Sequence, residues 1–200
     1  MRQRILCAIF VTVIVTSAPV QSSSPAANKS PGEIVDRLWR MATQGKLLTA
    51  NGWQRAAGFF SLPATPPDNS KIWVTSNDWG LDSESIKGSS AEVVMGFEDE
   101  GTIDAALRYT PPPKTDAVKT GIVYHLILQS THAPVYGPDG KTVVREMTGP
   151  AAWQIEDSPK TTWTTVNTAI RYVLETRSKT SDPILTRNAD DTIAKLLRLD

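Results

Sequence analysis

The chain has 200 residues, with 21 Lys and Arg against 21 Asp and Glu, and a single cysteine. Because the charges balance and the cations are scattered, the sequence has no basic stripe for nucleic acid, and nucleic-acid binding is not expected. The length is that of one domain, or of one domain with tails.

Residues 1–22 have the pattern of a secretory signal peptide. Arg2 and Arg4 precede an apolar run over residues 5–15, and residues with small side chains follow it. The run is shorter than the roughly 20 apolar residues that a membrane span needs. We therefore expect cleavage after about Ser22, no stable membrane anchor, and a periplasmic or extracellular location.

Cleavage changes the chemistry that the mature chain can use. It removes Cys7, the only thiol, so disulfides, thiolate nucleophiles and cysteine metal ligands are excluded from the mature protein. Two cations are also lost, leaving 19 Lys and Arg against 21 Asp and Glu. A cysteine-free domain outside the cytoplasm must be stabilised by its core.

A helix is expected directly after a Ser- and Pro-rich flexible leader over residues 23–30. Ser30, Pro31 and Glu33 combine an N-cap serine, a proline at the first helical position and the glutamate of a capping box. Apolar residues recur at helical spacing over residues 34–42, and Gly45 is positioned to end the helix.

A second helix is expected over residues 53–60, and it forms a hairpin with the first. Either Thr49 or Asn51 can cap it. It must stop before Pro63, because the residue before a proline disfavours the helical conformation.

The centre of the chain predicts strands instead. Runs rich in β-branched and aromatic residues, bounded by Gly, Pro, Asp and Ser, cover residues 72–75, 91–97, 102–110, 121–131 and 150–156. The turns after residues 110 and 135 are too short for crossover helices, so the sheet should be largely antiparallel.

Helical periodicity returns after Pro159. A stripe over residues 163–174, capped by Thr161 or Thr162, predicts one helix that ends before Asp182 and Pro183. A last helix is expected from Asn188 or from the acids at 190 and 191, presenting Ile193, Leu196 and Leu197. The predicted fold class is therefore α+β, with an N-terminal helical pair on a curved, largely antiparallel sheet of about five strands, and two C-terminal helices.

This order resembles a known superfamily. A helical pair containing residues 34–39, followed by a strand meander that finishes in Trp153-Gln154-Ile155, resembles the nuclear transport factor two-like superfamily. That cone-shaped fold includes ketosteroid isomerases, scytalone dehydratase and polyketide cyclases. The resemblance covers about residues 31–156 and implies a cone-like domain over 31–157. Residues 158–200 are then a helical extension packed on the same domain, which could cap the cone or close its mouth.

Enzymes of this superfamily use an Asp base, or an Asp and His pair with Tyr, inside the cone. His125 is the candidate of that type, since it lies mid-strand between Val123 and Ile127, where desolvation would perturb its pKa. A satisfied core histidine is the alternative interpretation. His132 is expected in a loop at the strand end.

Three aromatic residues are candidate ligand contacts. Strand alternation lets Tyr109 and Tyr124 point into the cone, where their hydroxyls would either orient a ligand or bond to the backbone. Trp79 lies in a polar, turn-rich run, where it would either rim a ligand site or fill a gap in the core.

The remaining polar residues predict no metal, cofactor or hydrolase site. Asp104 and Arg108 share one face of a strand, where we expect a solvated surface able to pair with Glu92 or Glu156. The acidic run over residues 77–84 lacks EF-hand spacing, and the two histidines lack the spacing of a zinc site. No Gly-x-Ser-x-Gly elbow is present.

These patterns favour an exported domain that binds a small apolar ligand or a protein partner in the cell envelope. This expectation rests on fold analogy and on the lack of a catalytic motif. One alternative is a cofactor-independent lyase or isomerase that uses His125 with Tyr109, Tyr124 or an acid. Another is a purely structural envelope protein, with a cone filled by tryptophan and phenylalanine and no pocket.

Overall fold

The computed structural model describes residues 29–61, 68–113, 120–136 and 142–199. The expected signal peptide and most of the leader lie outside these residues. The described chain has the expected α+β class, with four α-helices and two mostly antiparallel sheets of four strands each. No helix within it is both long and apolar enough to cross a membrane.

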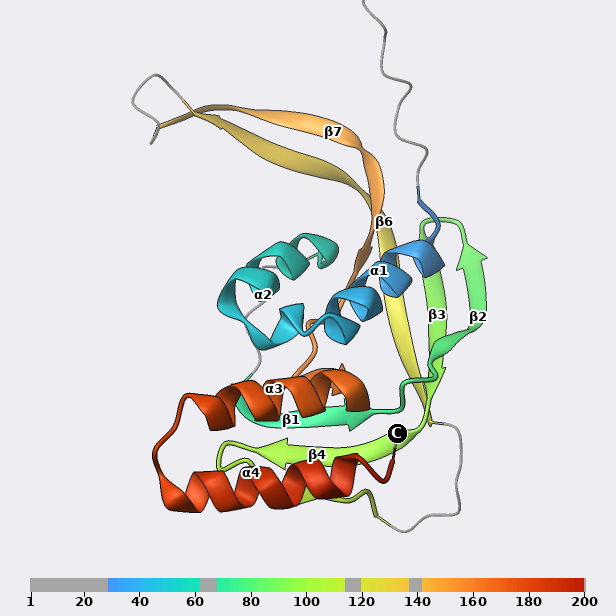
Figure 1. Ribbon diagram of the computed structural model, residues 1–200. Coiled ribbons are helices and arrows are strands. Elements are labelled where there is room, and N and C mark those ends of the chain that lie inside the picture. The colour runs from blue at the N-terminus through green and yellow to red at the C-terminus, as the bar shows by residue number, and fades with distance from the viewer. Residues whose placement is uncertain (1–28, 62–67, 114–119, 137–141, 200) are drawn as a thin grey trace, which may run out of the picture.

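The first sheet has the strand order β2-β3-β6-β7, and all its pairings are antiparallel. Its strands are β2 (Gly80–Lys87), β3 (Ser90–Phe97), β6 (Thr120–Tyr136) and β7 (Val143–Ile155). In Figure 1, the hairpin of β6 and β7 continues beyond the helices as a long two-stranded arm.

The second sheet has the order β5-β4-β1-β8. Its strands are β1 (Asp68–Thr75), β4 (Asp99–Asp104), β5 (Tyr109–Thr110) and β8 (Thr161–Thr165). β1 and β8 pair in parallel, with Trp73 opposite Trp163, and β1 pairs antiparallel with β4. The described residues therefore form eight strands where about five were expected, in two sheets and not one.

Local sequence signals placed the first helix correctly, whereas the second α-helix covers residues 50–56 and not the predicted 53–60. α1 (Pro31–Thr43) begins with the predicted capping box, in which Ser30 Oγ accepts from the Glu33 N–H and the Glu33 carboxylate accepts from the Ser30 N–H. Gly45 follows with a φ of 71°, the left-handed conformation that ends helices. The short helices η1 (Lys46–Leu48), α2 (Ala50–Ala56) and η2 (Ala57–Phe59) come next, and Thr49 caps α2.

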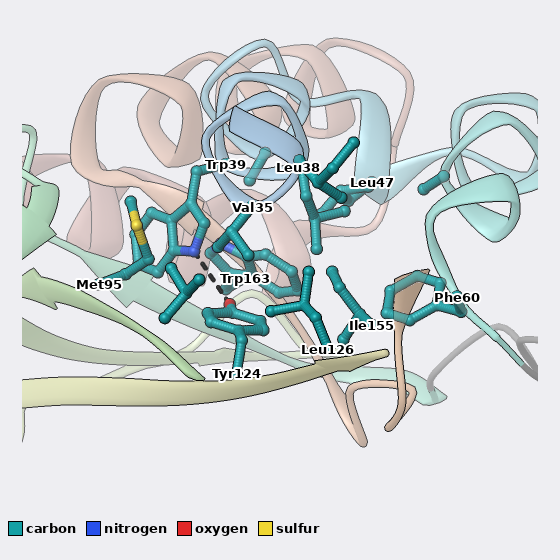
Figure 2. Packing of buried hydrophobic residues seen from close by; sticks show 14 of the residues in the cluster. Val35, Leu38, Trp39, Leu47, Phe60, Met95, Tyr124, Leu126, Ile155 and Trp163 are labelled. Atoms are coloured by element: carbon teal, nitrogen blue, oxygen red, sulfur yellow. Dashed lines mark hydrogen bonds between the residues drawn. The ribbon is translucent and has the colours of Figure 1, made fainter. Parts of the chain in front are cut away.

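Aromatic and aliphatic side chains fill the space between α1 and the first sheet (Figure 2). Trp39 is fully buried there, and its ring lies 5.2 Å from Phe97 and 5.8 Å from Trp163, measured between centroids. Leu38 of α1 and Leu126 of β6 belong to the same cluster. The interior that the resemblance predicted as a ligand-accepting cone is therefore packed with side chains.

The C-terminal helices pack on the second sheet. α3 (Val166–Ser178) and α4 (Pro183–Leu196) share a separate apolar cluster with Val74 of β1 and Ile103 of β4. Thr192 ties α4 to the same region, because its Oγ1 donates to the Leu107 carbonyl and accepts from the Tyr109 N–H. Figure 1 shows both helices beside β1 and β4, and α3 also reaches the end of α1, where Thr168 Oγ1 donates to the Thr43 carbonyl.

The predicted starts of the two C-terminal helices were wrong. Residues 161–165 form β8 and not the first turn of a helix. In this strand Trp163 lies opposite Trp73 in the second sheet and packs in the apolar cluster under α1 that contains Trp39. α4 begins at Pro183, where Asp182 caps it by accepting from the Ile184 N–H, and not at residues 188–191. Proline at a first helical position has no N–H to lose, so it begins helices as readily as it ends them.

The predicted strand over residues 102–110 is two strands separated by a turn. β4 ends at Asp104, and Leu107 has a φ of 60°, which is uncommon for a residue other than glycine. The Asp104 carboxylate accepts from the Ala106 and Arg108 N–H groups and stabilises this turn. The alternation argument for residues 104–110 therefore does not apply.

Candidate functional site

A partly open pocket of about 350 Å³ lies where the first sheet meets the second. One wall is formed by four consecutive residues of β6, numbers 122–125. The opposite walls come from Ile155 at the end of β7, from the connection over residues 157–160, and from Trp73 and Trp163 of the second sheet.

The pocket exists because β7 is shorter than β6 at this end. β7 pairs with β6 only as far as Ile155, opposite Leu126, and the Glu156 N–H donates the last bond to the His125 carbonyl at 2.9 Å. The chain then leaves the first sheet and enters β8 of the second. Within the described chain, residues 121–125 of β6 therefore have a strand on one side only, that of β3.

The inner wall of the pocket is apolar and aromatic. Trp163 is 3% exposed, and Trp73 packs edge-on against Phe97 with ring centroids 5.0 Å apart. Trp73 also donates from Nε1 to the Asp99 carboxylate at 2.7 Å, which fixes the orientation of the indole. Ile155 adds a fully buried aliphatic surface.

Two polar atoms in residues of this wall have no hydrogen-bond partner within the described chain. They are the indole Nε1 of Trp163 and the Oγ of Ser158, and both atoms are buried. A buried donor or acceptor without a partner costs about 1–3 kcal/mol. The wall thus contains hydrogen-bonding capacity that the protein itself does not use.

The rim carries ionisable side chains of different kinds. Asp157 and Lys160 come from the connection between β7 and β8, and His125 comes from β6. All three residues are exposed to solvent. An apolar floor with a few polar groups around it is the usual composition of small-molecule sites.

His125 does not lie in the buried setting that its apolar neighbours predicted. The residue is exposed, as is Val123 on the same face, at 47%. Its cross-strand neighbour on β3 is Glu92, and the two residues also line a shallower hollow of about 210 Å³. Alternating apolar residues indicated a covered face, but α1 packs on the opposite face of this sheet.

Tyr124 points into the core and not toward an open cavity. Its hydroxyl accepts a hydrogen bond from Trp39 Nε1 at 2.9 Å, as Figure 2 shows. Burial raises the pKa of Tyr124 far above its ordinary value, and the hydrogen bond from Trp39 only partly opposes this shift. The phenol is therefore a neutral structural partner of the Trp39 indole. Tyr124 also lines the pocket, although its hydroxyl is directed into the core.

Tyr109 lies in the second sheet, in a different apolar cluster from Tyr124. Its hydroxyl donates to the Glu100 carbonyl at 2.7 Å, which is the backbone bond that the alternative interpretation predicted. Partial burial and the negative charges of Glu100 and Asp99 raise the pKa of Tyr109. The structure does not bring the two candidate tyrosines together.

Trp79 fills a gap in the core. It is partly buried and packs against Trp39, with ring centroids 5.4 Å apart. The polar run around it is not a loop throughout, since residues 80–87 form the exposed edge strand β2. Glu84 of this strand accepts from the Gly32 N–H at 3.3 Å. No group of three or more metal-ligating side chains gathers anywhere in the described residues.

Asp104 and Arg108 pair with each other, and not with Glu92 or Glu156 as their expected place on one strand face suggested. Their side chains are 2.7 Å apart, because the chain turns between them. The pKa of Asp104 is lowered by hydrogen bonds and the charge of Arg108, against an opposing effect of desolvation. His132 belongs to β6, opposite Thr148, and not to a loop, and its side chain lies outside the described ones.

Sequence reasoning missed most of the pocket. Trp73 lies in a predicted strand and Trp163 in a predicted helical stripe, and neither pattern indicated that they line a cavity. Ser158 and Lys160 carried no signal, because they lie in an ordinary polar connection whose position depends on where β7 ends. His125 was the one candidate residue that the structure places on the pocket rim.

Comparison with known proteins added no assignment: no family model, no curated protein and no solved structure matches this chain. Its function is therefore argued from its own geometry.

Proposed function

We propose that this chain is an exported binding protein that holds a small apolar group in the pocket beside β6. The observation that carries the proposal is the pocket itself, about 350 Å³ in volume and walled by Trp73, Trp163 and Ile155. Ligand sites in proteins occupy about 300–1,000 Å³ and are mostly apolar with a few polar groups. Export is proposed from the signal-peptide pattern over residues 1–22.

Of the two unpaired buried atoms, the Ser158 hydroxyl is the one that a ligand with a hydrogen-bonding group would use, because it can turn. Ser158 can turn its hydroxyl by a single side-chain rotation, so a ligand acceptor or donor could pair with it. A purely structural protein would be expected to fill this space, as Trp39 and Phe97 fill the space under α1. The open pocket beside β6 therefore favours binding over the purely structural alternative.

Titration with a small neutral fluorophore, N-phenyl-1-naphthylamine, tests the proposal. We expect saturable fluorescence enhancement, and the variant Ile122→Asp, which puts a charge on the inward face of the pocket, should weaken binding about tenfold, or about 1.4 kcal/mol, in protein that remains folded by circular dichroism. Val144→Asp is the matched control, because Val144 is 60% exposed on β7 and does not line the pocket. Absence of saturable binding, or equal loss in both variants, would refute the proposal.

A second candidate is favoured by one observation, that His125 and Asp157 line the same pocket. A cofactor-independent lyase or isomerase would use His125 as a general base beside an acid. Neither side chain has a hydrogen-bond or ion-pair partner within the described chain, so nothing orients the imidazole as a base. The test is deuterium uptake at the α-carbon of cyclohexanone in D₂O. Uptake that disappears in His125→Ala supports this candidate, and uptake at the uncatalysed rate eliminates proton abstraction from such a ketone.

A further inference from the structure

One edge of β6 presents backbone groups to the pocket. The Leu128 N–H donates to the Ser89 carbonyl, on the β3 side, whereas the His125 carbonyl accepts from Glu156 on the other side. Backbone groups of successive residues in a strand point to alternate sides. The N–H and C=O of Val123 therefore point away from β3, along the side where β7 has ended.

These groups are unused within the described part of the chain. β7 reaches only Leu126, so no described strand pairs with Val123 on that side, and no described turn or loop bond reaches it. The His125 N–H points to the same side, and its carbonyl alone is bonded there. Three backbone groups, two donors and one acceptor, thus lie in a row along the pocket.

A row of this kind matches a particular chemistry. An extended polypeptide carries donors and acceptors at the same spacing, and it binds by adding a strand to an open sheet edge. A small apolar molecule could fill the pocket but would leave this row unpaired. We propose that the ligand is an extended peptide segment that pairs with the free edge of β6 at residues 121–125 and inserts an apolar side chain into the pocket. This inference rests on the proposed function and names its ligand class.

The pocket would select the side chains of such a peptide. Ile122 and Tyr124 face the interior, so the peptide residues beside them also point inward, toward the indoles of Trp73 and Trp163. The alternate residues lie beside Val123 and point outward to solvent. A peptide that alternates apolar and polar residues therefore fits the groove.

A second copy of this chain fits the edge poorly. If two β6 edges paired, the inward residues offered to each pocket would be Ile122 and Tyr124. Tyr124 is only 8% exposed and is bonded to Trp39, so it cannot leave its own core to fill a neighbour's pocket. A separate peptide has no such constraint.

The probe is a set of capped pentapeptides, acetyl-Thr-X-Thr-X-Thr-amide with X as Val, Leu, Ile or Phe. The control set has the same sequences with N-methyl groups on alternate residues, made in both registers, which removes backbone donors and keeps the side chains. We expect at least one peptide to bind at least tenfold more tightly than its N-methylated forms. Binding should also slow hydrogen exchange at the Val123 N–H by at least tenfold.

A pair of variants isolates the edge. Val123→Pro removes the N–H that faces away from β3, and proline is tolerated where a strand N–H faces away from its ladder. Val123→Thr keeps both the N–H and the branched side chain. We expect peptide binding to fall at least tenfold in the first and to persist in the second. Because the N-methylated peptides use the unmodified protein, the test stands even if Val123→Pro fails to fold.

The outcomes separate the two proposals. Saturable binding of the naphthylamine with no preference for unmethylated peptides would overturn strand addition and keep the apolar pocket. Absence of binding by every probe would overturn both. A dimer at micromolar concentration that Val123→Pro dissociates would assign the edge to a second copy and overturn the peptide proposal.

Discussion

The hydrogen bond between Trp39 and Tyr124 links α1 to β6 in the middle of the core, and its removal is a quantitative test of the packing. Tyr124→Phe deletes only the hydroxyl and leaves Trp39 Nε1 buried without its acceptor at 2.9 Å. The ring stays in place, so the loss comes from the unpaired donor, about 1–3 kcal/mol. For a chain of this size, each kcal/mol corresponds to about 2–4 °C in melting temperature.

Urea unfolding followed by tryptophan fluorescence measures this loss. Tyr109→Phe is the matched control, because the Tyr109 hydroxyl donates one hydrogen bond, to the Glu100 carbonyl, and the residue is only partly buried. We expect the control to lose about 1 kcal/mol or less. A double-mutant cycle with Trp39→Phe should give a coupling energy of at least about 0.5 kcal/mol. Equal losses in the two tyrosine variants, or zero coupling, would refute the reasoning.

Two further predictions concern the same core and the C-terminal helices. The raised pKa of Tyr124 means that the folded state favours the neutral phenol. The part of the unfolding free energy that depends on this group is therefore fully present below the ordinary tyrosine pKa of about 10, and it decreases as the pH rises above that value. The loss attributable to Tyr124 should approach about 1.4 kcal/mol per pH unit, and Tyr124→Phe should lack it when unfolding is measured from pH 9 to 11. Thr192→Val leaves the Tyr109 N–H without its acceptor and should cost about 1–3 kcal/mol in thermal unfolding, whereas Thr186→Val, which loses a bond within its own helix, should cost less. If Thr192→Val loses no more stability than Thr186→Val, the packing of α4 does not depend on the hydrogen bond between Tyr109 and Thr192.

Prediction from the sequence succeeded where the signal and its effect are close in the chain. The α1 start was confirmed because Ser30 and Glu33 bond to each other's backbone within one turn. The end of α1 was confirmed because Gly45 adopts the conformation that favours glycine. Such contacts form wherever the local sequence places them, and they need no partner from elsewhere in the fold.

Prediction failed where a distant partner decided the outcome. Residues 161–165 are two threonines, a tryptophan and two more threonines, which suit a strand or a helix cap equally. They became β8 because β1 offers a free edge, and Trp73 packs beside Trp163. For His125, the apolar neighbours predicted burial, yet exposure depends on which face of the sheet the helices cover.

By itself, the sequence determined the fold class, the first helical hairpin, four of the strands, and the absence of a thiol from the chain after residue 22. It also predicted the strand that carries His125, which lines the pocket. Only the tertiary structure decided the pocket, because a cavity depends on where one strand ends relative to its neighbour. β7 ends at Ile155 while β6 continues beyond it, and this difference in length leaves residues 121–125 without a described strand on the β7 side. No local pattern encodes such a difference, since it follows from how two segments far apart in the chain come into register.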